Sequence, residues 1–247
     1  MNRNYKEIYD ESLKNPEEFW QKVSEDVFWF KKPTKILKKD NPPFYKWFED
    51  GVTNTCYNAL DLHIDQGRGD KTALIYDSPI TESKAKFTFK ELKEKVSKFA
   101  GALDKQGVKK GDRVIIYMPM IPEAVVAMLA CGRIGAIHSV VFGGFASNEL
   151  ASRIDDSKAK ILITASCGFE PGRTVEYRPL VDGALKLAKH QVEKVILFQR
   201  KDHEVKLNKP LEISWDEALS GANDKDCVEM GANDYAYILY TSGTTGI

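Results

Sequence analysis

The residues most suggestive of chemistry form a glycine- and hydroxyl-rich stretch directly after an apolar run at 235–240. The stretch consists of Thr241, Ser242, Gly243, Thr244, Thr245 and Gly246. Glycine permits positive φ and a close approach of the backbone to a ligand. Consecutive N–H groups, helped by hydroxyl donors, can form a concavity that binds anions. The stretch therefore predicts a phosphate-binding loop, with a flexible turn as the alternative. It is not a P-loop of the G-x-x-x-x-G-K-[ST] type, because no lysine follows Gly246.

A second candidate site is Gly168-Phe-Glu-Pro-Gly-Arg173, which follows a predicted strand. A guanidinium can bind phosphate through two parallel hydrogen bonds, so Arg173 beside Gly172 is a candidate phosphate clamp. The alternative is a solvated surface charge. A third stretch, Phe142-Gly-Gly-Phe145, also follows a predicted strand. Its glycines either border a ligand or make a tight strand-to-helix turn, and the two interpretations are compatible.

The other polar candidates are predicted to be structural. We expect His138, inside an apolar strand, to be a hydrogen-bonded core histidine, and Asp155 and Asp156 to lie with Arg153 on a solvated helix face. The sequence predicts no metal site and no catalytic residue. The remaining histidines lack partners at metal-ligand spacing, and the cysteines lie far apart without a C-x-x-C pair: His63, His190, His203, Cys56, Cys131, Cys167 and Cys227.

Short β-branched or apolar runs alternate with helical stretches along most of the chain. The predicted strands lie at 73–76, 113–118, 136–141, 160–164, 194–198 and 235–240. One helix starts at the capping box formed by Thr88 and Glu91, another at Pro122, and others are expected near 148–156, 179–190 and 215–219. This alternation predicts an α/β fold with a largely parallel, layered sheet and flanking helices.

Residues 1–59 are richer in charged and aromatic side chains than the rest. Asn15-Pro16 and Asn54 are helix-start signals in this part. We therefore divide the chain into an irregular helical arm at 1–59 and an α/β domain at 60–247. The arm is expected to lay its aromatic side chains on the domain that follows.

The composition argues against nucleic acids and membranes as partners, and leaves the oligomeric state open. Lys plus Arg and Asp plus Glu both number 36 among 247 residues, so the formal net charge is zero. A neutral chain lacks the basic surface that nucleic acids or anionic membranes require. No apolar run approaches the ~20 residues that span a bilayer, and the first residues resemble neither a secretory signal nor a transit peptide. The expected location is the cytoplasm, with the mitochondrial matrix as the alternative.

Tyr240-Thr-Ser-Gly-Thr-Thr-Gly246 resembles the nucleotide phosphate loop of the adenylate-forming acyl-CoA synthetases. Residues 117–131 and 133–145 are similar to the acetyl- and propionyl-CoA synthetase branch of that family. Phe19-Trp20 and Lys46-Trp-Phe-Glu-Asp50 resemble the N-terminal arm of the same branch. The resemblance extends over essentially the whole chain.

The resemblance implies ATP- and Mg²⁺-dependent ligation of a short carboxylate, acetate or propionate, to CoA through an acyl-adenylate. It assigns the ATP phosphates to Thr241, Ser242, Gly243, Thr244, Thr245 and Gly246. It assigns CoA to Phe142, Gly143, Glu170, Pro171, Gly172 and Arg173. Glu170 stands where acetyl-CoA synthetases have the first arginine of an R-A-G-R segment, and E-P-G-R resembles the propionyl-CoA side instead.

Relative to this family, the sequence stops inside the phosphate loop. The acyl pocket, the adenine contacts and the catalytic lysine of the family would lie downstream. We therefore expect residues 1–247 alone to be inactive, and to be either prone to aggregate or dependent on the missing part. The alternative is a truncated, non-catalytic α/β module that binds a nucleotide, CoA or a full-length partner.

Overall fold

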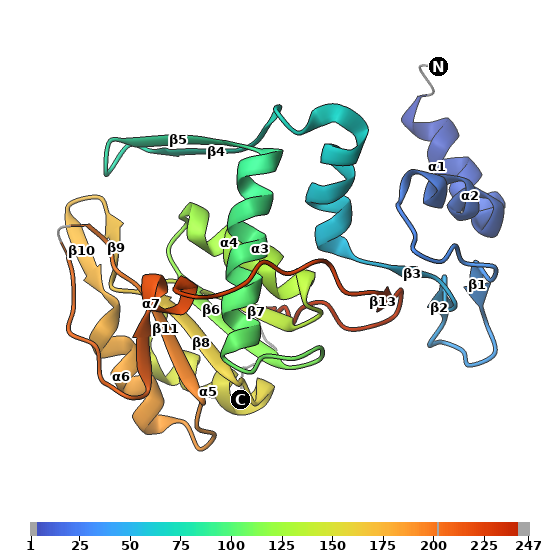
Figure 1. Ribbon diagram of the computed structural model, residues 1–247. Helices are drawn as coiled ribbons and strands as arrows, with labels where there is room; N and C mark the ends of the chain where they lie inside the picture. The colour runs from blue at the N-terminus through green and yellow to red at the C-terminus, as the bar shows by residue number, and fades with distance from the viewer. Residues whose placement is uncertain (1–3, 202, 242–247) are drawn as a thin grey trace.

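The computed structural model describes residues 4–201 and 203–241 (Figure 1). Within these residues, the largest sheet is parallel and five-stranded, in the order β12-β11-β8-β6-β7. Its strands are β6 (Arg113–Met118), β7 (Ile137–Phe142), β8 (Ile161–Ala165), β11 (Lys194–Phe198) and β12 (Glu212–Ser214). The central strand β8 is buried at every position because helices cover both faces of the sheet. The predicted α/β fold with a parallel sheet is confirmed.

Helices lie on both faces of this sheet because the chain reverses its direction across it. The step from β6 to β7 and the step from β7 back to β8 run in opposite senses, so right-handed crossovers place their helices on opposite faces. Accordingly α3 packs on α4, whereas α5 packs on α6. The helices are α3 (Phe89–Lys105), α4 (Pro122–Arg133), α5 (Ser147–Ser157), α6 (Tyr177–Leu187) and α7 (Trp215–Leu219). The capping box of Thr88 and Glu91 starts α3 as predicted.

Two predicted strands are placed differently from expectation. Residues 73–76 lie in β4 (Thr72–Ser78), which pairs antiparallel with β5 (Ser83–Thr88) outside the parallel sheet. Residues 235–240, all of them described, form no strand and make a single parallel bridge between Tyr237 and His138 of β7. In the described chain β7 is the edge of the sheet, so this segment has a partner on one side only. Its side chains accordingly stay exposed: 60% for Tyr237 and 71% for Leu239.

The N-terminal arm packs on itself more than was expected. It contains α1 (Tyr5–Lys14), α2 (Pro16–Val23), a 3₁₀ turn (Ser24–Asp26), β1 (Leu37–Lys38), β2 (Lys46–Trp47) and β3 (Val52–Thr53). The ring of Trp20 meets Trp47 at a centroid distance of 6.2 Å, and Trp29 meets Phe48 at 5.6 Å. The short β1–β2 hairpin returns the chain toward α2, which brings aromatic rings of the arm together locally. The expectation that they cover the later domain was therefore wrong for these rings.

The arm joins the domain through β3 and a buried asparagine. β3 pairs antiparallel with β13 (Met230–Gly231). The side-chain Oδ1 of Asn54 accepts hydrogen bonds from the backbone N–H groups of Cys56 and Tyr57, which confirms the predicted helix start. The helical segment 55–68 that follows includes the wide turns Tyr57–Asp61 and Ile64–Arg68. No helix in residues 4–201 and 203–241 is long and apolar enough to cross a bilayer.

Candidate functional site

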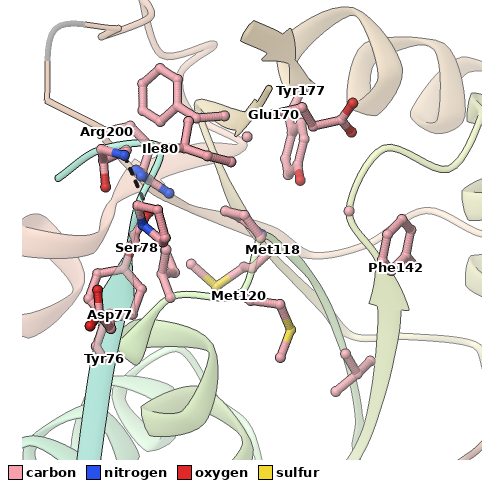
Figure 2. Close-up of a pocket in the computed structure, with 18 of the residues that line it drawn as sticks. Tyr76, Asp77, Ser78, Ile80, Met118, Met120, Phe142, Glu170, Tyr177 and Arg200 are labelled. Carbon is pink, nitrogen blue, oxygen red and sulfur yellow. Dashed lines mark hydrogen bonds between the residues drawn. The ribbon is translucent and has the colours of Figure 1, made fainter. Parts of the chain in front are cut away.

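A pocket of about 350 Å³ lies at the edge of the sheet where the parallel strands end (Figure 2). Met118 ends β6, Phe142 ends β7, and the hairpin of β9 (Cys167–Glu170) and β10 (Arg173–Glu176) follows β8. On the opposite side the pocket is bounded by residues 76–81 of the β4–β5 hairpin. Ligands in open α/β sheets bind in the crevice outside the carboxyl ends of the strands. The pocket therefore lies where the fold class places a small-molecule site.

The turn after β7 is held by a buried tyrosine that the sequence analysis did not identify. The Tyr117 hydroxyl donates to the carbonyl oxygen of Phe145 at 2.8 Å and accepts from the Gly144 N–H at 3.1 Å. Burial raises the pKa of Tyr117, so the phenol stays protonated as the donor. Gly144 has φ +100°, a conformation that requires glycine. The expected tight turn is therefore present, and it lines the pocket through Phe142 and Gly143.

A second tyrosine fills the space beside Gly143. A Cβ built on Gly143 would lie 2.0 Å from the Tyr177 hydroxyl, and one on Gly168 would lie 2.8 Å from it. The Tyr177 ring is nearly fully buried and packs on the Tyr117 ring at 4.9 Å between centroids. The phenol of Tyr177 thus occupies a notch between two glycines at the rim of the pocket (Figure 2). Nothing in the spacing of the sequence joins Tyr177 to Gly143.

The E-P-G-R segment is the tip of the β9–β10 hairpin. Glu170 and Arg173 are opposite each other in the ladder, so Pro171 and Gly172 form the turn. Gly172 has φ +75°, and proline followed by a positive-φ glycine is typical of a type II turn. The Arg173 guanidinium is 71% exposed and forms an ion pair with the Glu170 carboxylate at 2.6 Å. Glu170 lines the pocket, whereas Arg173 does not; its exposed side chain is accessible to an anion.

The predicted phosphate loop is represented by its first residue alone. Thr241 is exposed, and residues 242–246 lie outside the described chain. The parallel bridge pairs Tyr237 with His138, so the segment advances beside β7 toward the edge at which β7 ends. Thr241 follows Tyr237 by four residues, as Phe142 follows His138. Beyond this bridge residues 238–241 form no strand, and the Tyr240 hydroxyl reaches Asp156 of α5.

Arg153 of α5 links these two segments. Its guanidinium carbon lies 5.3 Å from the centroid of the Phe145 ring and 5.0 Å from that of Tyr240. Only 7% of Arg153 is exposed, and its Nη1 donates to the Glu149 carboxylate at 2.8 Å. The expectation of a solvated Arg153 was therefore wrong, because rings from two distant segments cover it. Asp156 is exposed as expected, and it accepts a hydrogen bond from the Tyr240 hydroxyl at 2.5 Å.

A larger, adjoining cavity of about 740 Å³ shares Arg200 with the pocket. Arg200 follows β11, and its guanidinium carbon lies 4.9 Å from the centroid of the Phe169 ring. Lys84, Lys201 and His203 also line this cavity. The position of Arg200 just after a predicted strand is the signal that could have marked it as a pocket residue.

His138 differs from the expected hydrogen-bonded core histidine. Its Nδ1 is buried and has no hydrogen-bond partner in the structure. Burial lowers the pKa of His138, so the imidazole is neutral in the folded chain at neutral pH. The side chain contacts Tyr237, with 5.8 Å between ring centroids, rather than the pocket. No role as a base follows from this position.

The chain resembles known proteins along its whole length. Residues 63–247 match the family described as AMP-binding enzyme, and residues 5–59 match the acetyl-coenzyme A synthetase N-terminus. The chain is 53% identical over 244 residues to human acyl-CoA synthetase short-chain family member 3, mitochondrial, covering 98% of this chain and 36% of that protein. It is 44% identical to acetyl-coenzyme A synthetase of Streptomyces avermitilis, covering 97% and 37% respectively.

A solved structure, acetoacetyl-CoA synthetase from Streptomyces lividans, superposes with a TM-score of 0.87 at 26% identity. The alignment covers 99% of this chain and 37% of that one. The chain thus spans a little over a third of the length of the curated relatives named above. Its parallel sheet, the matched residues and these relatives together place the chain in the family of AMP-binding enzymes, and it aligns with the N-terminal part of acyl-CoA synthetase relatives.

Proposed function

We propose that the chain supplies the N-terminal part of an enzyme that joins a short carboxylate, acetate or propionate, to CoA at the expense of ATP. The observation that carries the proposal is the linkage of three segments, two of which line one pocket while the third shares the Arg153 side chain with one of them. These segments are the Phe142–Phe145 turn, the tip of the β9–β10 hairpin, and the residues that lead into the glycine-hydroxyl stretch. A reaction that uses ATP and CoA in succession needs sites for both molecules within reach of one carboxylate.

The hairpin tip and the Phe142–Phe145 turn suit the nucleotide end of CoA. The Phe142 ring is 66% exposed beside the pocket, and an exposed aromatic face can stack on a base. Arg173 can bind a phosphate group, for which the Glu170 carboxylate is the competing partner. Pro171 and Gly172 hold Arg173 at the tip. Because Glu170 already neutralises Arg173, the grip on CoA is weaker than that of a free guanidinium.

Thr241 to Gly246 would hold the ATP phosphates while the carboxylate attacks the α-phosphorus. Backbone N–H groups and hydroxyls of this stretch orient the phosphates, and such positioning lowers the barrier without covalent chemistry by the protein. Its hydroxyl groups can also ligate the Mg²⁺ that accompanies ATP. We assign this phosphate-binding role to the stretch. We also propose that the chain is divided into an arm at 1–59 and a domain at 60–247. Four free cysteines fit a reducing compartment, the cytoplasm or, as in the name of the human relative, the mitochondrion.

Exchange of labelled pyrophosphate into ATP tests the proposed adenylation. A protein that carries these residues together with the remaining length of its relatives should exchange with acetate or propionate. Residues 1–247 alone should exchange at least roughly a thousandfold more slowly, because catalytic groups that act as a unit lose their effect when separated. Exchange of comparable rate by residues 1–247 would contradict the expectation. Absence of exchange in the longer protein, with CoA still bound, would favour a non-catalytic binding module.

Substitution of Arg173 tests the proposed CoA site. Arg173→Ala should weaken CoA binding by about tenfold, since a charge-assisted hydrogen bond contributes roughly 1.5–3 kcal/mol and Glu170 already offsets part of it. Glu170→Gln should strengthen binding, because it removes the competing carboxylate. Lys186→Ala, on the exposed surface of α6, is the matched control. Calorimetric titration with CoA gives the affinity of each variant for comparison with the unsubstituted protein. An unchanged CoA affinity in Arg173→Ala would contradict the proposed phosphate clamp.

A further inference from the structure

A buried cluster of two thiols, a carboxylate and a guanidinium lies away from the pocket. Cys56 and Asp61 come from the helical segment 55–68, Arg133 ends α4, and Cys227 lies in the segment 220–229 that crosses α3. The Sγ atoms of both cysteines and a carboxylate oxygen of Asp61 all lie within 4.8 Å of one another. The spacing of the cysteines along the sequence argued against a disulfide. Both cysteines are free thiols in the structure, as that spacing predicts, but the fold brings residues 56 and 227 close together.

One nitrogen of Arg133 contacts all three of these groups. Its Nη1 lies 2.7 Å from Asp61 Oδ2, 3.1 Å from Cys227 Sγ and 3.6 Å from Cys56 Sγ. Arg133 is 1% exposed, and its Nη2 donates to the other Asp61 oxygen at 3.0 Å. Thiolates and carboxylates also bind metal ions, but here the guanidinium occupies the centre of the group. A metal ion would have to displace a fully buried arginine from a bidentate ion pair.

The charges around the pair favour a thiolate. Asp61 neutralises one positive charge, yet both Arg133 and Lys93 pair with it, Lys93 Nζ at 3.1 Å. One cationic charge therefore remains to be balanced, and a thiolate beside Arg133 balances it. A hydrogen bond from the Cys227 thiol, together with the nearby Arg133 charge, lowers the pKa of Cys56 despite its burial. A thiolate beside a cation is the reactive form of cysteine.

Small solutes can reach the pair from the side of Cys227. Cys56 is completely buried, whereas Cys227 is half-buried. The segment 220–229 contains no helix or strand, and backbone hydrogen bonds from Lys225 to Ser97 and from Val228 to Arg133 hold it on either side of Cys227. Side chains of Ser97, Arg133 and Asn54 add further hydrogen bonds to Lys225 and Val228, but the backbone of Cys227 itself lies in neither a helix nor a strand. A stretch outside regular structure opens locally more easily than the sheet does. Opening between these two ties exposes both sulfur atoms.

We propose that Cys56 and Cys227 are a modification site at which a peroxide forms a reversible intramolecular disulfide. The thiolate of the pair attacks the O–O bond of hydrogen peroxide, giving a sulfenic acid and hydroxide, which takes up a proton to become water. The other thiol then displaces the sulfenic hydroxyl group, forming the S–S bond and releasing a second water. Two thiols lose two electrons and hydrogen peroxide gains them. A dithiol reductant reverses the reaction by thiol–disulfide exchange.

The bond would join the N-terminal arm to the segment that leads toward residues 235–241. A cross-link between positions far apart in the sequence restricts the unfolded chain strongly. The oxidised chain should therefore unfold at a higher temperature than the reduced chain, with the reduced value restored by dithiothreitol.

Peptide mapping of the purified 247-residue chain tests the pair directly. Each cysteine lies in a separate tryptic peptide: 47–68 for Cys56, 114–133 for Cys131, 161–173 for Cys167 and 226–247 for Cys227. After treatment with hydrogen peroxide and alkylation, mass spectrometry should show peptides 47–68 and 226–247 linked, with the loss of two hydrogens. The number of reactive thiols in denaturant should fall from four to two.

Three variants make the test specific. Cys227→Ala and Cys56→Ala should each lose the linked peptide and the rise in unfolding temperature. Cys227 is half-buried, so its variant keeps the test valid if Cys56→Ala fails to fold. Cys131→Ala, in the completely buried face of α4, should keep both effects. Links that involve Cys131 or Cys167, sulfinic acids in place of a link, or stoichiometric zinc that protects both thiols would each overturn the proposal.

Discussion

Glycine is needed at position 143 because of the side chain that faces it, not because of its own backbone conformation. Gly143 does not have a positive φ, whereas the following Gly144 does. The space for a Cβ is taken by the Tyr177 hydroxyl at 2.0 Å and the Met118 carbonyl oxygen at 3.0 Å. Gly172 shows the opposite case, with φ +75° and nothing within 4 Å of an added Cβ. One glycine is required by close packing and the other by conformation.

Gly143→Ala should lower the free energy of unfolding by about 1–3 kcal/mol, because the new methyl group must displace a buried tyrosine. Tyr177→Phe removes the clashing oxygen, so the double variant should lose less than the sum of the single variants. Gly172→Ala, the matched control, should lose about 1 kcal/mol through strain at positive φ, independently of Tyr177. Urea unfolding curves give the four values. An equal loss for Gly143→Ala with and without the Tyr177 hydroxyl would contradict this account.

Strand β7 has one buried and one exposed side, because it lies at the edge of the sheet. Val141 is buried, whereas Val140 and Phe142 are 45% and 66% exposed. On one side β7 pairs with β6 over its full length, and on the other it meets residues 235–240 at a single bridge. His138 lies at that bridge with an unpartnered Nδ1. The single bridge beside β7 thus coincides with a histidine whose buried Nδ1 lacks a hydrogen-bond partner.

The buried imidazole makes the stability of this element depend on pH. Burial lowers the pKa of His138 below 6.5, so the unfolded chain takes up a proton before the folded chain does. Stability is therefore lost as the pH falls below about 6.5, until the folded histidine also titrates. Urea midpoints at pH 7.5 and pH 5.5 should show this drop, and His138→Gln should reduce it. His63→Gln measures the contribution of the second histidine whose pKa is lowered. A full drop retained in His138→Gln would refute this origin.

Exposed apolar side chains gather along one edge of the whole molecule. Val140 and Phe142 on β7 and Tyr237 and Leu239 on the neighbouring segment are 45–71% exposed. An uncovered sheet edge with apolar side chains is a surface on which other chains can pair. The described chain therefore offers a surface for self-association, and the aggregation of residues 1–247 alone stays a prediction.

Light scattering of residues 1–247 should show species larger than a monomer that grow with concentration. Leu239→Lys should reduce this growth, since a charge at the edge opposes strand pairing. Leu13→Lys on α1, where the wild-type side chain is 63% exposed but remote from β7, should leave it unchanged. A monomer at all concentrations, or an equal effect of the two lysines, would show that this edge is not the associating surface.

The sequence by itself determined the features that depend on near neighbours along the chain. Continuous apolar runs mark β6, β8 and β11, and the Thr88–Glu91 capping box marks the start of α3. These signals are local because strand burial and helix capping are set by residues within a few positions of each other. The same local patterns marked the turn after β7 and the tip of the β9–β10 hairpin, two of the segments at the candidate site.

Only the tertiary structure decided which distant residues meet. The packing of Tyr177 against Gly143, the cover of Phe145 and Tyr240 over Arg153, and the approach of Cys227 to Cys56 join segments far apart in the sequence. The placement of 73–76 in a separate hairpin and of 235–240 beside a sheet edge belongs to the same class. Such contacts arise from the order of the strands and the side of each crossover, which no local pattern of side chains encodes.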